Sequence, residues 1–174
     1  MTQRQADALS LSRKVLRVLI RLNLVFGGAV LALLIASVIA EDFVMRGLGV
    51  QDGPGRAEFI AGGRLIMVFG LASVPLAQVV LMRLREVVDT VGRGNPFELE
   101  NAARLRRIAW AVLGMEGLHL AIGSVARYAS QSGQSLDIAW EFSLARWLTV
   151  LLLFVLAQVF EQGSRMREDL EGTV

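Results

Sequence analysis

The sequence predicts an all-α protein, a bundle of four transmembrane helices. Four apolar stretches carry this prediction, and they cover residues 18–40, 65–82, 108–126 and 144–160. Each comes close to the roughly 20 mostly apolar residues that a helix needs to cross a hydrocarbon core. The composition agrees, because 54% of the 174 residues are hydrophobic and the mean hydropathy is +0.53. A soluble helical bundle is the alternative, but these stretches lack the amphipathic alternation of a surface helix.

The first stretch begins with an amphipathic segment. Its side chains form an apolar set of Leu11, Val15, Val18 and Leu22 and a basic set of Arg13, Arg17 and Arg21. Arginines next to an apolar face extend toward lipid phosphates. The run ends at Val38-Ile39-Ala40, which resembles the small-residue cleavage site of a secretory signal peptide. The run is too long for the apolar region of a signal peptide, and three further stretches follow. We therefore expect a retained membrane helix.

Small residues predict close helix packing in three of the stretches. They are Gly28, Ala32, Ala36 and Ala40 in the first stretch, Gly70, Ser73 and Ala77 in the second, and Gly117 and Ala121 in the third. Small side chains at this spacing allow two helix backbones to approach closely. Packing within one chain and packing between copies in a homo-oligomer both remain open. Pro75 removes a backbone hydrogen bond in the second stretch and predicts a kink there.

Basic residues fall mostly on one side of the predicted topology. The richer side carries Arg4, Arg13, Lys14, Arg17, Arg21, Arg83, Arg85, Arg93, Arg104, Arg106, Arg107, Arg165 and Arg167. The poorer side carries Arg46, Arg56, Arg64, Arg127 and Arg146. Lys and Arg are retained preferentially on the cytoplasmic side of short loops. Both termini and the connection at residues 83–107 are therefore expected in the cytoplasm, and residues 1–174 are expected to form a single domain.

Polar residues inside the apolar stretches are candidate sites. Glu116 and His119 are three residues apart on the third stretch, so they share one helix face near mid-membrane. A charge at that depth costs roughly 2.5–3.5 kcal/mol on insertion scales and normally faces the bundle interior. The pair is either an intramembrane sensing site or a buried pair that fixes helix register. Asn23, Gln78 and Gln158 are expected to form hydrogen bonds between helices.

Composition argues against several classes of chemistry. The chain has no cysteine and one histidine, so we expect no thiolate chemistry, no metal site and no cofactor. No nucleophile, base and orienting group stand together, which argues against an enzyme. The net charge is only +2 and the arginines flank the apolar stretches, so direct nucleic-acid binding is not expected. Glu161 and Arg165 have the spacing of an ordinary helical ion pair.

The connection between the second and third stretches contains the most distinctive local sequence. Gly92 and Gly94 end one helix, and Asn95 is a good N-cap for the next, with Pro96 at its first position and Glu98 placed for a capping box. A helix is thus expected to start at Asn95. Phe97 at such a corner would offer a docking surface, although a capped hairpin without a partner explains the same residues. The candidate partner-binding residues are Arg93, Asn95, Pro96, Phe97, Glu98, Glu100, Asn101 and Arg104.

These residues resemble a bacterial family of four-helix inner-membrane proteins, the domain of unknown function numbered twenty-nine seventy-five. The resemblance rests on the Gly-Asn-Pro-Phe…Glu-Asn…Arg-Leu segment of residues 94–105. The final helix, with Val159-Phe160-Glu161-Gln162-Gly163, and the tail at residues 166–174 support it. The match covers the second half well and the first half mainly through the pattern of spans. It implies a multi-pass protein of the bacterial inner membrane.

The same resemblance implies a partner. Genes of this family commonly lie beside one for a small Xre/Cro-type helix-turn-helix regulator. The leading interpretation is therefore a non-enzymatic membrane regulator that binds or sequesters such a transcription factor, with membrane lipids as its other partners. The alternative is a small transporter, channel or immunity-type protein that uses Glu116 and His119 as a polar pathway.

Overall fold

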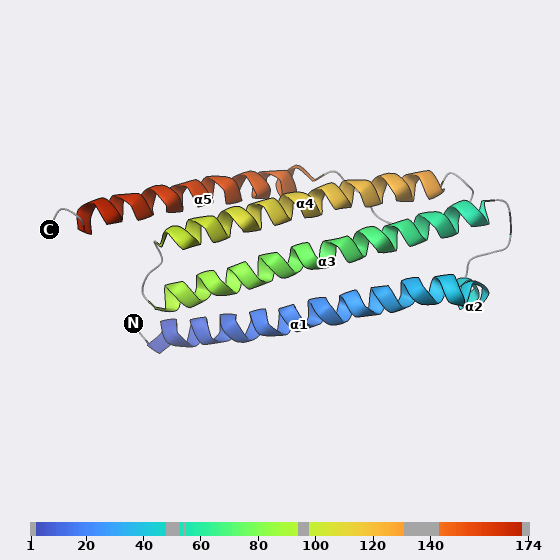
Figure 1. Ribbon diagram of the computed structural model, residues 1–174, viewed down its shortest axis with the longest axis horizontal. Helices are drawn as coiled ribbons and strands as arrows, with labels where there is room; N and C mark the ends of the chain where they lie inside the picture. Colours follow the sequence, from blue (N-terminus) through green and yellow to red (C-terminus); the bar gives the residue numbers. More distant parts are fainter. Residues whose placement is uncertain (1–2, 48–52, 54, 94–97, 131–142, 172–174) are drawn as a thin grey trace. The chain divides into compact units, whose positions relative to one another are not determined.

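The protein folds into helices over nearly the whole of its described length. The computed structural model describes residues 3–47, 53, 55–93, 98–130 and 143–171, and Figure 1 shows their helices in chain order. These helices are α1 (Gln3–Ile39), α2 (Glu41–Gly47), α3 (Arg56–Gly92), α4 (Leu99–Ser130) and α5 (Leu144–Glu171). Four of them, α1, α3, α4 and α5, are long and apolar enough to cross a membrane. The predicted all-α class with four membrane-spanning helices is confirmed.

The four long helices exceed the thickness of a bilayer core. α1 and α3 contain 37 residues each, α4 contains 32 and α5 contains 28. At about 1.5 Å per residue, 37 residues extend about 55 Å, against a hydrocarbon core of about 30 Å. The helices therefore continue well past the apolar stretches into polar sequence. α3 runs without interruption through Pro75 and ends at Gly92, where its end was predicted.

The start of α4 differs from the prediction. A helix starting at Asn95 would place Glu98 in its first turn, but α4 begins at Leu99 and Glu98 lies outside it. The backbone N–H of Asn101 donates to the carbonyl of Glu98 at 2.8 Å, so a tight turn rather than the helical pattern occurs there. The N-cap and docking roles predicted for Asn95, Pro96 and Phe97 concern residues 94–97, which lie outside the described residues.

Contacts divide the chain into two compact units. The first unit comprises Met1–Asn23, Leu76–Gly114 and Ser143–Val174, and the second comprises Leu24–Pro75 and Met115–Phe142. Helices α1, α3 and α4 contribute to both units, whereas α5 belongs to the first. On α3 the division falls directly after Pro75.

An apolar cluster of α4 and α5 residues forms the core of the first unit. Leu105 and Ile108 of α4 and Ala157 of α5 are buried at its centre, with Val80, Val112, Leu153 and Phe160 packed against them. At the edge of this contact, Trp110 and Phe154 meet edge to face with ring centroids 5.3 Å apart. A Cβ at Gly114 would lie 3.1 Å from Cδ1 of Leu76, so glycine permits a close approach of α3 and α4.

The inward face of α1 follows an alternation of three and four residues. In the first unit the less exposed positions are Leu9, Arg13, Leu16, Ile20 and Asn23, and in the second unit they include Gly27, Val30, Leu34 and Ser37. This alternation is typical of helices that pack as in a left-handed coiled coil. The close contact of α1 in the second unit is made by Gly27, whose Cβ position lies 3.0 Å from Cγ1 of Val74.

The small-residue stripe predicted to pack α1 lies on another face. Gly28, Ala32 and Ala40 are exposed, and a Cβ at Gly28 would meet none of the described atoms within 4 Å. Gly70 and Gly117, from the other two stripes, also have such open space. No described atom of the chain therefore packs against Gly28, Gly70 or Gly117. On α1 the contact face lies one residue away from Gly28, about 100° around the helix. Packing through the stripes between two copies stays a prediction.

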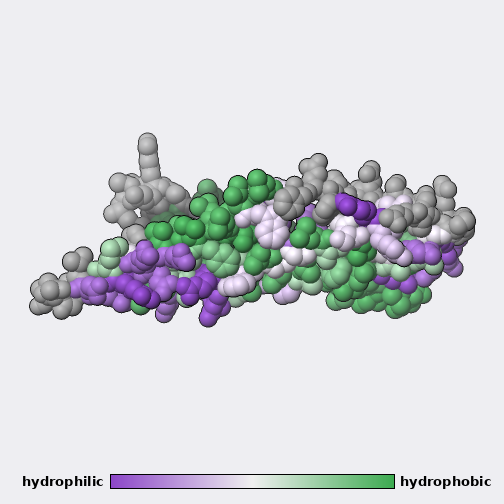
Figure 2. All heavy atoms as spheres, turned by 90° about the horizontal axis from the view of Figure 1, so that it is seen from above, coloured by the Kyte–Doolittle hydropathy of each residue, from purple (hydrophilic) through white to green (hydrophobic). Residues whose placement is uncertain are grey.

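Large apolar side chains cover much of the outside of the helices. Val25 is 68% exposed, Phe26 is 60% exposed and Leu152 is 64% exposed. Figure 2 shows broad hydrophobic areas open to the surroundings on the face that it presents. A soluble protein rarely exposes contiguous apolar patches of this kind. The surface is that of a helical protein whose surroundings are hydrocarbon.

Candidate functional site

Two fully buried polar side chains connect α3 and α4 in the first unit. Thr90 and Asn101 each have a relative exposure of 0%. The side-chain amide of Asn101 donates to Oγ1 of Thr90 at 2.8 Å. The Thr90 hydroxyl can donate either to the carbonyl of Val87 at 2.8 Å or to Oδ1 of Asn101 at 3.0 Å. Each polar group therefore has a partner, as burial requires.

Arg104 extends this pair into a charged network. Its Nη1 donates to Oδ1 of Asn101 at 2.8 Å, its Nε donates to Glu86 at 3.1 Å, and it also contacts Glu100 on its own helix. Glu86 also accepts two hydrogen bonds from Nη1 of Arg83, at 2.8 and 2.9 Å. The polar ends of α3 and α4 are thus cross-linked by charge-assisted hydrogen bonds.

The two arginines lower the pKa of Glu86, which lies outside the apolar stretch of α3. The hydrogen bond from Arg83 is the largest cause, and the charge of Arg83 and the contacts of Arg104 act in the same direction. Partial burial opposes them by raising the pKa, but it is the weaker effect. The carboxylate is therefore held in its charged form.

Arg13 links α1 to the same end of α3. Its Nε lies 2.7 Å from Oδ1 of Asp89, and a Cβ at Gly92 would lie only 2.5 Å from its Nη2. The guanidinium thus lies across the last turn of α3, where any side chain larger than that of glycine would displace it. The sequence grouped Arg13 with Arg17 and Arg21 as one basic set. Arg13 differs from the other two because it pairs with Asp89, whereas Arg17 and Arg21 are exposed.

Glu161 connects α4 with α5. Arg106 of α4 contacts its carboxylate, and Arg165 pairs with the other carboxylate oxygen at 2.8 Å. The predicted pair of Glu161 and Arg165 is confirmed. In the first unit, ion pairs therefore join α1 to α3, α3 to α4 and α4 to α5 beyond the apolar stretches.

The candidate partner-binding residues divide between surface and interior. Arg93 and Glu100 are exposed, and Glu98 is half-buried. Asn101 is fully buried and Arg104 is 16% exposed, so both belong to the network that holds α3 against α4. Sequence reasoning missed Thr90 and Asp89 as members of this network. The local signals that pointed to it were the helical spacings of Arg83 with Glu86, Arg85 with Asp89, and Glu100 with Arg104.

Glu116 and His119 lie on α4 in the second unit. Both side chains are half-buried. Their three-residue spacing keeps them on neighbouring positions of one helix face, as predicted. Of the other polar residues, Asn23 donates to Gln78 at 3.0 Å, which confirms an interhelical hydrogen bond between α1 and α3. The side chain of Gln158 is exposed.

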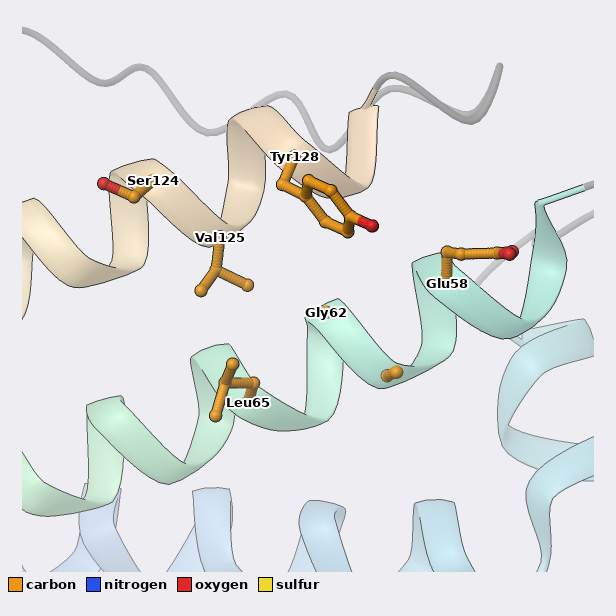
Figure 3. Close-up of a pocket in the computed structure, with 7 residues that line it drawn as sticks. Glu58, Gly62, Leu65, Ser124, Val125 and Tyr128 are labelled. Atoms are coloured by element: carbon orange, nitrogen blue, oxygen red, sulfur yellow. The ribbon is translucent and has the colours of Figure 1, made fainter.

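A cleft of about 390 Å³ opens between α3 and α4 in the second unit (Figure 3). Its lining residues are Glu58, Ala61, Gly62, Leu65, Ser124, Val125 and Tyr128. A Cβ at Gly62 would lie 2.7 Å from Cβ of Ala129, so the two helices are in close contact beside the cleft. Neither Glu116 nor His119 lines this cleft. Glu58 comes from the first turn of α3 and Tyr128 from the last turn of α4, and Figure 3 shows both at the same side of the cleft.

Arg64 binds the C-terminal end of α1 in the second unit. It donates to the carbonyl of Ser37 in the last turn of α1 and to Glu41 of α2 at 2.8 Å. Arg56 makes a second bridge from α3 to α2 through Asp42 at 3.0 Å. A cation on the last carbonyls of a helix satisfies groups that have no partner within the helix.

Comparison with known proteins gives one match. Residues 45–174 match the family model described as "Protein of unknown function (DUF2975)". The matched range includes α3, α4 and α5 and the distinctive segment at residues 94–105. No curated protein and no solved structure matches the chain.

Proposed function

This chain belongs to the DUF2975 family, and from that premise we propose that it is a non-enzymatic membrane regulator that binds a small cytoplasmic helix-turn-helix transcription factor. The proposed partner is of the Xre type. The proposed location is the bacterial inner membrane, with both termini and the connection between α3 and α4 in the cytoplasm. The charge distribution of the sequence supports that orientation.

The observation that carries the proposal is the cross-linked polar end of the first unit. Helices α1, α3, α4 and α5 continue beyond their apolar stretches, and ion pairs of Arg13, Arg104 and Glu161 connect them there. A surface that is already ordered loses less conformational entropy when a partner binds. Arg93 and Glu100 remain exposed at this end and are available for contact.

The C-terminal part of α5 adds further charged groups to the same unit. Its exposed residues beyond the apolar stretch include Arg165, Arg167, Glu168 and Asp169. Charged groups of both signs favour specific contacts with a small soluble domain over general attraction. Binding and release of the partner would require two conformations of different affinity, and we propose that Glu116 and His119 bias them.

The test is binding of the purified full-length protein, in mild detergent, to the helix-turn-helix protein encoded beside its gene. We expect a saturable complex that is weakened at least about tenfold by Arg93→Glu combined with Phe97→Ala. The matched control is Arg46→Glu, which makes the same charge change at an exposed residue on the opposite side of the proposed topology. Absence of a complex, or equal loss with the control, would refute the proposal.

The transporter alternative has less support. The cleft described above is lined by residues other than Glu116 and His119, so it does not support a solute pathway past that pair. Flux of protons or solutes into liposomes that is abolished by Glu116→Gln would nevertheless place this function ahead of the regulator.

A further inference from the structure

The basic residues of the described structure differ in whether they have acidic partners. Those in ion pairs with carboxylates are Arg13, Arg56, Arg64, Arg83, Arg85, Arg104, Arg106 and Arg165. Lys14, Arg17 and Arg21 on α1 are exposed, and none of the three contacts a carboxylate among the described residues.

The three cations lie together on one strip of α1. At about 100° per residue, positions 14, 17 and 21 fall within a sector of about 60°, and they span about 10 Å along the helix axis. The part of α1 from Leu9 to Ile39 contains no acidic residue that could pair with them. The acidic residue that α1 does meet, Asp89, is already held by Arg13 at 2.7 Å.

An exposed apolar strip runs directly beside the cations. Leu11 is 62% exposed, Val18 is 54% exposed and Leu22 is 55% exposed. On a helical projection the nearest of these residues, Val18, lies about 40° from Lys14. Leu16 and Asn23 point to the opposite side of the helix, which is the packed side. A cationic strip next to an apolar strip is the arrangement that places a helix face at the boundary of headgroups and acyl chains.

The position along the chain fits the depth of a headgroup layer. The apolar stretch of α1 begins near Val18, so Arg21 lies just inside it and Lys14 just outside it. The headgroup region on each side of a bilayer is roughly 5–7 Å thick. Flexible side chains of arginine and lysine can bring all three charges into that layer.

We propose that Lys14, Arg17 and Arg21 form a binding surface for the phosphate groups of anionic phospholipids. The guanidinium groups supply paired N–H donors that match phosphate oxygens, and the neighbouring apolar strip contacts the acyl chains. The surface lies on α1, apart from the residues proposed for partner binding, and does not depend on that proposal.

The test measures which lipids stay bound to the full-length protein. The protein is purified in mild detergent, mixed with phosphatidylglycerol or phosphatidylcholine of the same acyl chains, and analysed by native mass spectrometry. We expect tighter binding of phosphatidylglycerol. In the triple variant Lys14→Gln, Arg17→Gln, Arg21→Gln, the ratio of the affinities for the two lipids should fall at least about tenfold. One basic residue near an anionic surface changes affinity by roughly fivefold.

Two variants serve as controls. Arg46→Gln, Arg107→Gln, Arg127→Gln removes the same total charge from exposed positions elsewhere and should keep the preference. Lys14→Arg, Arg17→Lys, Arg21→Lys keeps the charge on the strip and should also keep it. Inorganic phosphate should not displace the lipid, because it lacks the acyl chains.

Several results would overturn the proposal. They are equal binding of the two lipids to the natural sequence, an unchanged preference in the glutamine variant, an equal loss in the first control, or displacement by inorganic phosphate. If the glutamine variant does not fold, the lipid preference of the natural sequence is measured at low and at high ionic strength instead. Raising ionic strength from about 0.1 to about 1 M shortens the screening length from about 10 to about 3 Å. A preference that survives this change refutes a surface of exposed charges.

Discussion

The side-chain amide of Asn101 on α4 donates a hydrogen bond to Oγ1 of Thr90 on α3, and both side chains are fully buried. They are eleven residues apart in the chain, with Thr90 near the end of α3 and Asn101 near the start of α4. Arg104 donates to the side-chain oxygen of Asn101, so the pair joins the buried contact to the charged network. A buried polar group without a partner lowers the free energy of unfolding, whereas a hydrogen-bonded one fixes how the helices align.

Removing one member of this pair should destabilise the protein. Asn101→Leu leaves Thr90 and Arg104 without a shared partner, and Thr90→Val removes the hydroxyl that accepts from the Asn101 amide. We expect each change to lower the free energy of unfolding by about 1–3 kcal/mol. Thermal unfolding in detergent measures this. The double variant should cost less than the sum of the two, and strict additivity would contradict the pairing.

Glycine substitutions should separate packed from open helix faces. Gly62→Ala would bring a Cβ within 2.7 Å of that of Ala129, and we expect a loss of about 1–3 kcal/mol from overpacking. Gly117→Ala meets open space among the described residues and should be neutral or stabilise the helix by up to about 1 kcal/mol. The two unfolding midpoints, measured in the same detergent, should move apart. Equal shifts would refute the contact of Gly62.

The interhelical amide pair can be tested with a matched amide. Gln78→Leu breaks the 3.0 Å hydrogen bond with Asn23 and should destabilise the protein by roughly 0.6–2 kcal/mol. Gln158→Leu makes the same chemical change at an exposed position of α5, so it should have no such effect. The comparison uses thermal unfolding of the two variants. A larger loss for Gln158→Leu would show that the pair contributes little.

Acid should weaken the Glu86 network. Arg83 and Arg104 hold the pKa of Glu86 below its ordinary value in the folded protein. Its contribution to stability is therefore present above the pKa of the unfolded chain and is lost as the pH falls through the folded-state pKa. The drop in unfolding midpoint between about pH 7 and about pH 3 should be smaller in Glu86→Gln than in the natural sequence. Glu58→Gln, at an exposed carboxylate, should leave the drop unchanged.

The orientation of the helices can be tested by cysteine labelling. The sequence contains no cysteine, so a single introduced thiol gives an unambiguous signal. We expect Gly53→Cys to react with a membrane-impermeant maleimide from outside the cell and Arg93→Cys to react only after permeabilisation. Both residues lie outside the helices, at exposed positions. The reverse pattern would invert the predicted topology and remove the basis for a cytoplasmic partner.

Local features of the sequence determined the helices themselves. Hydropathy over about 20 residues predicted the four spans, because the hydrocarbon thickness sets that length regardless of neighbours. Gly92 marked the end of α3, and the spacing of Glu161 and Arg165 predicted an ion pair within α5. These features depend on residues within a few turns of one another.

Only the tertiary structure decided which helix faces point inward. It placed Gly27 rather than Gly28 in the close contact of α1, turned Arg13 toward Asp89, and buried Asn101 against Thr90. The physical reason is that lipid tails are as apolar as a helix interface, so hydropathy does not distinguish the packed face from the lipid-facing one. The choice depends on side chains that are distant in the chain, and it appears only when the helices are assembled.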